Sequence, residues 1–276
     1  MQVFLGLDGG GTGCRAALAD RDGRVLGRAE GGPANIMSDR EGALAVILEV
    51  AGQALAGRDP AGVAACLGLA GANMPEARDW IAARLPFGRC RVVHDAVTAV
   101  AGALGPADGI VAAIGTGSVF SRQSGEEILT IGGWGPVLGD EAGGAWMGRR
   151  FLGHVLRAVD GLVAETPLTR ATLERFGGAP AIVTLAATAT AADFGREARH
   201  MLEWHGDPAC EAVLKAAGDY VTQVIDRLQP DDAPLPVTFT GGLGPIFADR
   251  LFDCWAQRPA RGNPLDGALR LARELG

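Results

Sequence analysis

Val3–Leu18 reads VFLGLDGGGTGCRAAL, and this stretch decides the fold. Its apolar start predicts a strand over residues 2–8 that ends at Asp8, and a second strand over 13–19 returns after a glycine-rich turn. Glycines carry no Cβ, so the backbone N–H groups of such a turn can close around an anion. We therefore predict a phosphate-binding hairpin, with Asp8 placed where a magnesium ion bound to the phosphate would lie.

This turn differs from other glycine-rich nucleotide motifs. A P-loop needs Lys-Ser/Thr after its glycines and then a helix, whereas the only lysine of the chain is the distant Lys215. The same scarcity argues against a protein-kinase site, which needs a strand lysine. A Rossmann motif should open a helix, but the segment after Gly13 alternates like a strand. A tight hairpin with no ligand remains the alternative.

The composition limits the class of protein. The 276 residues are 48% hydrophobic, enough for one large domain or two ordinary ones. The net charge of -7 without a basic block argues against a nucleic-acid partner. No apolar run reaches the roughly 18 residues of a membrane span, and no signal peptide precedes the first strand, so we expect neither a membrane partner nor export.

The cysteines are odd in number and show no C-x-x-C spacing. They stand at positions 14, 66, 90, 210 and 254. Each is flanked by apolar residues or lies in a predicted element, so we expect buried free thiols in a reduced, cytoplasmic protein.

The pattern of elements occurs twice along the chain. The first copy has predicted strands over 2–8, 13–19, 24–30, 63–69 and 89–94 and helices over 39–56, 75–85 and 95–104. The second has strands over 109–114, 119–122, 126–131 and 236–240, and helices over 141–158, 167–176, 180–188, 190–228 and 264–275, with a further helix after Gly242. We predict two α/β halves, residues 1–107 joined by the C-terminal helix 264–276, and residues 108–263. A phosphate hairpin from each half would then face a shared cleft.

Three motifs carry a resemblance to a known superfamily. They are LDGGGT at 7–12, IGTGS at 114–118 and FTGG at 239–242. In this order they resemble the two phosphate loops and the adenosine loop of the sugar kinase/Hsp70/actin superfamily. The resemblance implies duplicated ribonuclease H-like (actin-like ATPase) domains that bind ATP and Mg2+ in an interdomain cleft.

Further motifs indicate a narrower group. They are GPAN at 32–35, LAGA at 69–72, HDA at 94–96, GGWGPVLGDEAG at 132–143 and NPLDGAL at 263–269. This set resembles the BadF/BadG/BcrA/BcrD ATPase family and, within it, is most similar to N-acetylglucosamine kinases and bacterial glucosamine kinases. Family likeness also leads us to expect a homodimer.

Phosphoryl transfer to a sugar needs magnesium, donors for the phosphates and a base near the attacking hydroxyl. Asp8 is the candidate magnesium holder, acting through water. The candidate ATP-binding residues are Gly9, Gly10, Gly11, Thr12, Gly13, Thr116, Gly117, Gly241 and Gly242. The resemblance makes Asp95 the base that accepts the proton of the sugar 6-hydroxyl. It implies sugar contacts from Asn35, Asp95, Gly133, Trp134, Gly135 and Asp140.

Several of these residues also have an ordinary structural interpretation. From spacing alone, Asp95 could cap a helix, Asn35 could close an Asx-turn, and Trp134 could be a core aromatic residue. Asp140 and Glu141 are typical of a helix N-terminus, and for Glu141 the sequence indicates nothing more.

The predicted reaction is ATP-dependent phosphorylation of the 6-hydroxyl of N-acetylglucosamine, with glucosamine as the alternative substrate. The two sugars differ by one acetyl group, so the shape of a pocket decides between them, and residues 70–73 with Trp134 are expected in its wall. A more remote alternative is an ATPase that activates an iron–sulfur dehydratase or reductase, which would need exposed cysteines. The other remote alternative is a module that binds ATP but catalyses no reaction.

Overall fold

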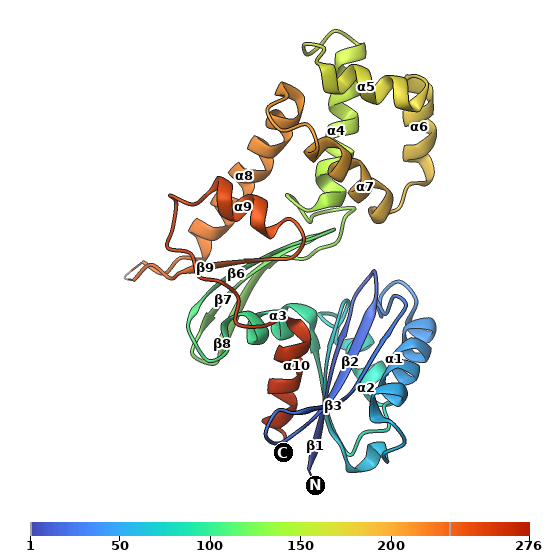
Figure 1. The fold of residues 1–276 in the computed structure, drawn as a ribbon, viewed down its shortest axis with the longest axis vertical. Coiled ribbons are helices and arrows are strands. Elements are labelled where there is room, and N and C mark those ends of the chain that lie inside the picture. The colour runs from blue at the N-terminus through green and yellow to red at the C-terminus, as the bar shows by residue number, and fades with distance from the viewer. Residues whose placement is uncertain (1, 232) are drawn as a thin grey trace. The chain divides into compact units, whose positions relative to one another are not determined.

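The computed structural model describes residues 2–231 and 233–276, which form two compact units. The first contains the chain up to Val111 together with Gln123–Ile128 and Pro259–Gly276, and the second contains Ala112–Arg122 and Leu129–Arg258. The predicted boundary after residue 107 remains a prediction. Figure 1 labels the elements of each unit.

The first unit is built on a five-stranded mixed sheet in the order β3-β2-β1-β4-β5. Its strands are β1 (Val3–Gly9), β2 (Cys14–Asp20), β3 (Val25–Gly31), β4 (Ala64–Leu69) and β5 (Arg89–His94). Its helices are α1 (Arg40–Leu55), α2 (Pro75–Ala82), α3 (Asp95–Leu104) and α10 (Pro264–Arg273), with a 3-10 turn at Pro60–Gly62. β1 pairs antiparallel with β2 and parallel with β4, and β4 pairs parallel with β5.

Alternation along β1 divides the core of this unit between two faces. Val3, Leu5 and Leu7 belong to the cluster formed with α1 and α2, whereas Phe4 packs in a cluster with residues of α3 and α10. Because successive side chains of a strand point to opposite faces, Asp8 lies on the same face as Phe4. The candidate magnesium holder is therefore on the side of the sheet that α3 and α10 cover.

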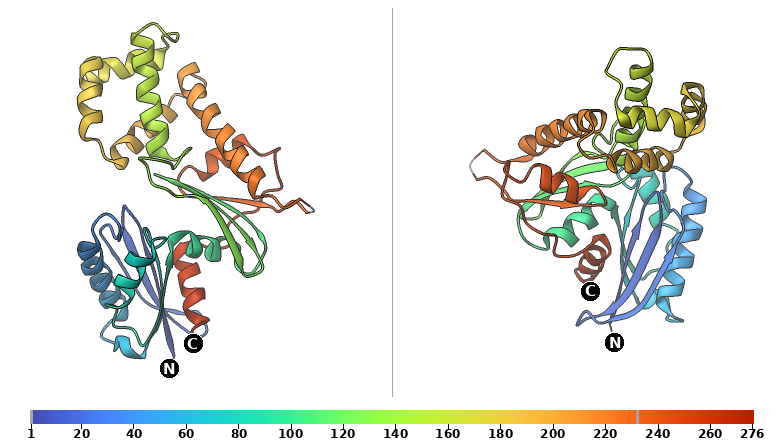
Figure 2. Two further views of the ribbon diagram at one scale, coloured as in Figure 1. Left: turned by 180° about the vertical axis from the view of Figure 1, so that it is seen from behind. Right: turned by 45° about the horizontal axis from the view of Figure 1, so that its top comes forward.

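Glycines, which have no side chain, allow α10 to approach this face closely. A Cβ on Gly6 would lie 2.6 Å from the backbone nitrogen of Leu269, and one on Gly267 would lie 2.0 Å from the carbonyl oxygen of Thr98. Figures 1 and 2 show α10 beside α3 in each view. The C-terminal helix thus belongs to the packing of the first unit, to which the chain returns at Pro259 after the second unit ends at Arg258.

A second sheet, in the order β8-β7-β6-β9, lies mainly in the second unit, with the start of β6 and the β7–β8 turn counted in the first. Its strands are β6 (Gly109–Ile114), β7 (Ser118–Ser124), β8 (Glu127–Gly132) and β9 (Val237–Thr240). The helices of the second unit are α4 (Gly144–Val159), α5 (Pro167–Phe176), α6 (Ala179–Thr188), α7 (Ala191–Leu202), α8 (Pro208–Leu228) and α9 (Gly244–Arg250). The α/β fold class with two mixed sheets is confirmed.

Two predicted helices differ from the structure. The helix predicted over 190–228 is two helices, because Gly206 has φ 85° and Asp207 caps α8 with its side chain on the N–H of Ala209. The helix predicted from 141 begins at Gly144, since Asp140 and Ala142 have left-handed φ values of 57° and 67° that no helix accepts. Backbone conformation at single residues therefore ended elements that periodicity alone would have extended.

The expectation of five buried thiols is wrong for two of them. Cys14, Cys66 and Cys210 are buried, but Cys90 and Cys254 are exposed. Cys90 lies on β5, the edge strand of its sheet, where its neighbours Arg89 and Arg91 are also exposed. An edge strand has a paired neighbour on one side only, so a position in a strand does not guarantee burial there.

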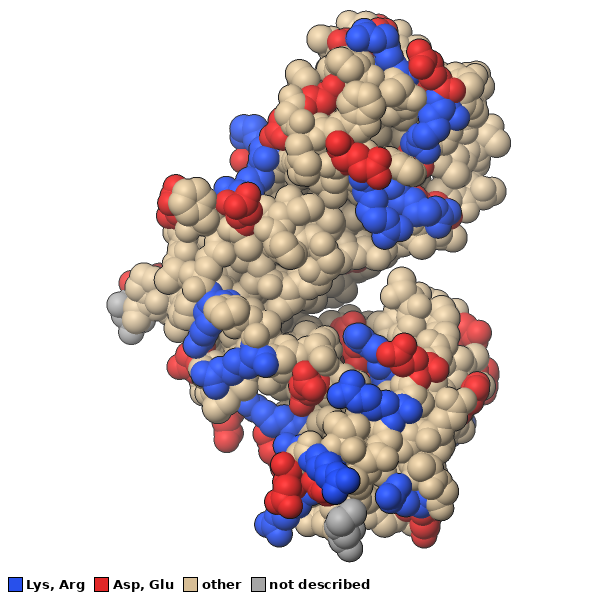
Figure 3. Space-filling model, viewed as in Figure 1, with Lys and Arg blue, Asp and Glu red and all other residues tan. Residues whose placement is uncertain are grey.

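Two further properties concern possible partners: the distribution of charge on the surface and the presence of a helix that could cross a membrane. In the face drawn in Figure 3, basic and acidic side chains are interspersed within each unit. In the described part of the chain, no helix combines the length and the apolar character that crossing a membrane requires.

Candidate functional site

The glycine hairpin of the first unit presents an exposed tip. The N–H of Gly10 donates to the carbonyl oxygen of Gly13 at 2.9 Å, which closes the turn. Gly11 and Thr12 at the tip are exposed, and a Cβ added to Gly11 would have no atom within 4 Å. The tip can therefore receive an anion without displacing protein atoms.

Two further loops join this hairpin through backbone hydrogen bonds. The N–H of Ala34 donates to Gly10 at 2.9 Å, and the N–H of Ala70 donates to Gly9 at 2.8 Å. The N–H of Ile36 in turn donates to Ala70 at 3.1 Å. The predicted sugar-binding segments around residues 35 and 70–73 thus lie next to the predicted phosphate hairpin.

Asn35 adopts the Asx-turn that its structural interpretation predicted. Its side-chain oxygen accepts the N–H of Met37 at 2.9 Å. This bond uses one acceptor of the side-chain amide, whose nitrogen still carries two donors. The turn therefore orients Asn35 and is compatible with a sugar contact.

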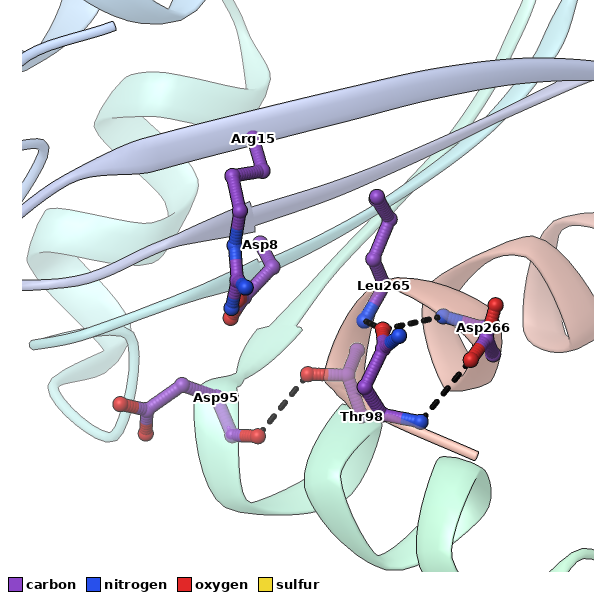
Figure 4. Close-up of polar contacts among 7 residues, drawn as sticks. Asp8, Arg15, Asp95, Thr98, Leu265 and Asp266 are labelled. Carbon is purple, nitrogen blue, oxygen red and sulfur yellow. Dashed lines mark hydrogen bonds and ion pairs between the residues drawn. The ribbon is translucent and has the colours of Figure 1, made fainter. Parts of the chain in front are cut away.

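Arg15 is a charged residue of the site that the sequence analysis missed. It lies directly opposite Asp8 in the β1–β2 register, and its guanidinium nitrogen is 2.6 Å from a carboxylate oxygen of Asp8. A hairpin symmetric about Gly11 and Thr12 places these two residues together, so the signal was present in the spacing. Figure 4 shows the ion pair at the end of the strands.

Burial, Arg15 and Asp95 each shift the pKa of Asp8. Burial raises the pKa of the Asp8 carboxyl above its usual value, the Arg15 hydrogen bond and charge oppose this, and the nearby Asp95 charge raises it further. In the sheet register Asp8 and Val93 both pair with Gly68, so Asp95 follows at the same edge of the sheet as Asp8. One hard carboxylate, completed by water and phosphate oxygens, is a donor set that suits Mg2+.

Asp95 begins α3 but does not cap it. The N-cap is His94, whose side chain makes no cap hydrogen bond. One oxygen of Asp95 accepts the N–H of Ala96 at 2.9 Å and lies 3.0 Å from Nε2 of His94. The side chain remains 36% exposed, and Figure 4 shows its carboxyl group pointing away from α3. The capping interpretation of Asp95 is therefore wrong, and the group is accessible to a substrate hydroxyl.

Thr98 and Gly68 allow the first turn of α3 to pack closely against the sheet. The buried Thr98 hydroxyl donates to the carbonyl oxygen of Asp95 at 2.8 Å. A Cβ on Gly68 would lie 2.1 Å from that hydroxyl, so only glycine leaves room for Thr98 there. Because Gly68 pairs with Asp8 in the β1–β4 register, the first turn of α3 rests against the strand end that carries Asp8.

In the second unit, the predicted phosphate and adenosine loops converge at one end of the sheet. The N–H groups of Gly144 and Ala145 donate to the carbonyls of Gly115 and Thr116 at 2.8 and 2.9 Å. The N–H of Leu243 donates to Ile114 at 3.0 Å. Gly241 has φ 81° and would place a Cβ 2.4 Å from the Ile114 oxygen. Glycine is therefore required at 241 both by its positive φ and by the close approach of the Ile114 oxygen. Gly242 is the next residue of this loop.

Asp140 connects the phosphate loop of this unit with the loop around Trp134. Its carboxylate accepts the N–H of Gly135 at 3.0 Å. A Cβ on Gly117 would be 2.1 Å from the other carboxylate oxygen. The side chain of Asp140 therefore lies against both loops at once.

Trp134 is not a core residue. It is 74% exposed, and the flanking Gly133 and Gly135 have φ values of 71° and 88°. Asp140 and Glu141 precede α4 rather than forming its first turn. An exposed indole beside a fixed carboxylate is an arrangement that suits a sugar ring, with apolar area and a hydrogen-bond acceptor together.

Comparison with known proteins gives the relationships of the chain. Residues 5–246 match the BadF/BadG/BcrA/BcrD ATPase family. The chain belongs to that family. It is 30% identical over 284 residues to a glucosamine kinase of Vibrio cholerae, covering 99% of this chain and 96% of the relative.

Solved structures agree with this membership. A candidate N-acetylglucosamine kinase from Chromobacterium violaceum superposes with a TM-score of 0.89 at 33% identity, covering 99% of both chains. A ROK family glucokinase from Streptomyces griseus matches with a TM-score of 0.61 at 21% identity, again over 99% of both chains, which shows a shared fold alone. The predicted family and the actin-like fold are confirmed. The roles of the individual site residues remain predictions.

Proposed function

We propose that this protein transfers the γ-phosphoryl group of ATP to the 6-hydroxyl of N-acetylglucosamine, with glucosamine as the second candidate substrate. Membership of an ATPase family and similarity to hexosamine kinases support the reaction class. The observation that carries the proposal is the arrangement of Asp8, Arg15 and Asp95 beside an open glycine hairpin.

In the proposed reaction, Asp95 accepts the proton of the 6-hydroxyl as its oxygen attacks the γ-phosphorus. A new P–O bond forms to the sugar, the bond to the β-phosphate oxygen breaks, and ADP leaves. Asp8 would hold Mg2+ through water, and a bound Mg2+ joins the phosphates and offsets their charge. Arg15 can turn from Asp8 toward a phosphate oxygen, since its side chain is 48% exposed.

The remaining candidates bind rather than react. Gly9–Gly13 in the first unit, and Thr116, Gly117, Gly241 and Gly242 in the second, would hold the nucleotide. Asn35, Gly133, Trp134, Gly135 and Asp140 would hold the sugar. Each unit thus contains one glycine-rich loop and some of the candidate sugar-binding residues.

A cavity lined by residues that follow Asn35 in sequence supports the acetylated sugar as the first candidate. It has a volume of about 360 Å³ and is lined by Ile36, Met37, Ser38, Arg40, Met74, Glu76 and Ala77. Methionine side chains adapt to a small apolar group such as a methyl, whereas the lining carries both Arg40 and Glu76, so its charges do not separate the two sugars. Glucosamine remains the second candidate because the Vibrio cholerae relative, matched over nearly its whole length, is a glucosamine kinase.

One kinetic comparison tests the proposal. ADP release is coupled to NADH oxidation with N-acetylglucosamine, glucosamine, glucose or no sugar, at fixed ATP and Mg2+. We expect kcat/KM to be highest for N-acetylglucosamine and the sugar-free rate to be negligible. A higher kcat/KM for glucosamine would reverse the order of the two candidates. ATP hydrolysis independent of any sugar, together with bound iron, would instead favour the electron-transfer activator.

A further inference from the structure

Ser118 is a buried residue whose hydroxyl the proposed reaction does not use. It begins β7 directly after Gly117, and it is 5% exposed. Its hydroxyl donates to the carbonyl oxygen of Glu141 at 2.5 Å, a contact that joins residues 23 positions apart within the second unit. Ser118 therefore ties the start of β7 to the segment that carries Asp140.

The segment around Glu141 has a backbone conformation that needs support from outside. Asp140 and Ala142, on either side of Glu141, have left-handed φ values of 57° and 67°. Non-glycine residues adopt this conformation rarely, and it persists where surrounding contacts enforce it. The hydrogen bond from the N–H of Gly143 to the carbonyl of Asp140, at 3.0 Å, lies within the turn itself. The contact with Ser118 reaches the turn from another element, at a residue between the two left-handed positions.

This turn lies directly against the loop that precedes β7. A Cβ added to Gly143 would lie 2.8 Å from Cα of Gly117, and one added to Gly117 would lie 2.1 Å from a carboxylate oxygen of Asp140. The other carboxylate oxygen accepts the N–H of Gly135 at 3.0 Å. A small shift of the turn would therefore change the position of the Asp140 carboxylate between these neighbours, and the bond from Ser118 opposes such a shift.

The preceding part of the loop has an anchor of its own. Arg149 of α4 donates to the carbonyl oxygen of Pro136 at 3.0 Å, and the N–H of Gly139 donates to the carbonyl of Gly135 at 2.9 Å. These bonds hold residues 135–139 as a closed turn. Loss of the Ser118 hydroxyl should therefore affect the part of the loop that carries Asp140 and leave residues 135–139 closed.

We propose that Ser118 is a positioning residue that holds the left-handed turn and thereby fixes the carboxylate of Asp140 for the sugar. The inference rests on the proposed function, in which Asp140 binds the sugar. It assigns the Ser118 hydroxyl to sugar binding, although the residue directly follows Gly117, which is proposed to bind ATP. When such an anchor is lost, the binding-competent conformation is populated less, and the apparent affinity falls by the same fraction.

The kinetic test uses Ser118→Ala, which removes only the hydroxyl group. Loss of a neutral hydrogen bond changes an equilibrium by roughly threefold to tenfold. We expect the sugar KM to rise by about this factor, while kcat and the ATP KM change less than twofold, because Asp140 is proposed to bind the sugar and not to react. An unchanged sugar KM, or a rise in the ATP KM in its place, would overturn the proposal.

Ser121→Ala is the matched control. Ser121 is also a buried serine of β7, and its hydroxyl shares a hydrogen bond with that of Thr130 at 2.9 Å. Because it stands three positions after Ser118, it points to the opposite face of the strand. We expect Ser121→Ala to lose a similar amount of stability in urea denaturation, with the sugar KM within twofold of wild type. An equal rise in the sugar KM of both variants would show a structural role alone and overturn the assignment.

A second measurement does not depend on activity. Hydrogen exchange followed by mass spectrometry reports the local opening of residues 133–145. The hydrogen-bonded amides of this segment include those of Gly135 and Gly143. We expect the segment to exchange about threefold to tenfold faster in Ser118→Ala, and at the wild-type rate in Ser121→Ala. Unchanged exchange in Ser118→Ala would refute the anchor even if the enzyme is active.

The two readouts separate the two proposals. If the wild-type protein phosphorylates no amino sugar but exchange accelerates in Ser118→Ala, the anchor exists, and the proposed function fails together with the role of the anchor in sugar binding. If the wild-type protein phosphorylates an amino sugar and neither readout changes, the proposed function stands and the role of Ser118 fails. If Ser118→Ala does not fold, Ser118→Cys replaces it in both measurements, because a thiol is a weaker donor.

Discussion

The two glycine hairpins differ in what surrounds them. The hairpin of β1 and β2 carries the charged pair Asp8 and Arg15, and its tip is open. The turn between β6 and β7 has no charged pair of its own, and it is enclosed by the start of α4 and the side chain of Asp140. The two copies of the motif thus differ in their surroundings, and under the proposed function the first would meet the reacting charges while the second would hold a ligand.

The largest expected effect tests the chemistry assigned to the first unit. Asp95→Asn keeps the size of the side chain but removes the base, so we expect kcat to fall by about 10²–10⁴ with ATP affinity retained. Steady-state kinetics and ATP titration measure the two quantities. Asp79→Asn, at an exposed carboxylate on α2 of the same unit, is the control and should be near wild type. Near-normal turnover of Asp95→Asn would remove the assignment of the base.

The second prediction compares the two turns directly. Gly117→Ala places a Cβ 2.1 Å from Asp140, whereas Gly11→Ala meets no protein atom within 4 Å. We expect the first change to reduce the free energy of unfolding by about 1–3 kcal/mol and the second to change it by less than about 0.5 kcal/mol. Urea denaturation measures both values.

ATP binding should also distinguish the two turns. Because the Gly11 tip is where phosphate is proposed to bind, Gly11→Ala should weaken ATP binding despite its normal stability. Equal stability losses in the two variants would contradict the distinction between an open and an enclosed turn.

The smallest effect concerns Arg15. Its charge and hydrogen bond lower the pKa of Asp8, against the effect of burial. In Arg15→Gln the pKa of Asp8 should rise further, so Asp8 loses its negative charge at a higher pH and the acidic limb of the kcat/KM profile moves upward. We expect ATP affinity to fall about tenfold at neutral pH, as for loss of one charge-assisted bond. The ion pair itself is partly exposed, so stability without ligand should change by less than about 1 kcal/mol. An unmoved acidic limb would show that Asp8 does not control it.

Much of the fold could be predicted from local patterns. The strand Arg89–His94 and the helices Asp95–Leu104 and Pro167–Phe176 have the predicted ends, because apolar periodicity and turn residues change sharply there. Prediction failed where one residue decided the outcome, as at Gly206 and at the left-handed Asp140 and Ala142. Such conformations depend on contacts from elsewhere in the chain, which periodicity does not contain.

The candidate site shows the same division. Asp8 was predicted because it ends a strand before a glycine-rich turn, whereas Asp95 and Asp140 were predicted from the resemblance to the family. Their partners were not, since Arg15 and Thr98 become neighbours through strand pairing and helix packing.

By itself, the sequence determined two glycine-turned α/β halves, since these follow from residue type and local spacing, and its motifs carried the resemblance that implied an ATP-dependent kinase. Only the tertiary structure decided which charges lie together, that Asp95 is not a helix cap, and that Trp134 is exposed. The physical reason is the separation in sequence of the residues that specify each feature. Glycine turns and alternating strands are specified by neighbouring residues, whereas ion pairs and buried hydrogen bonds depend on how distant segments pack.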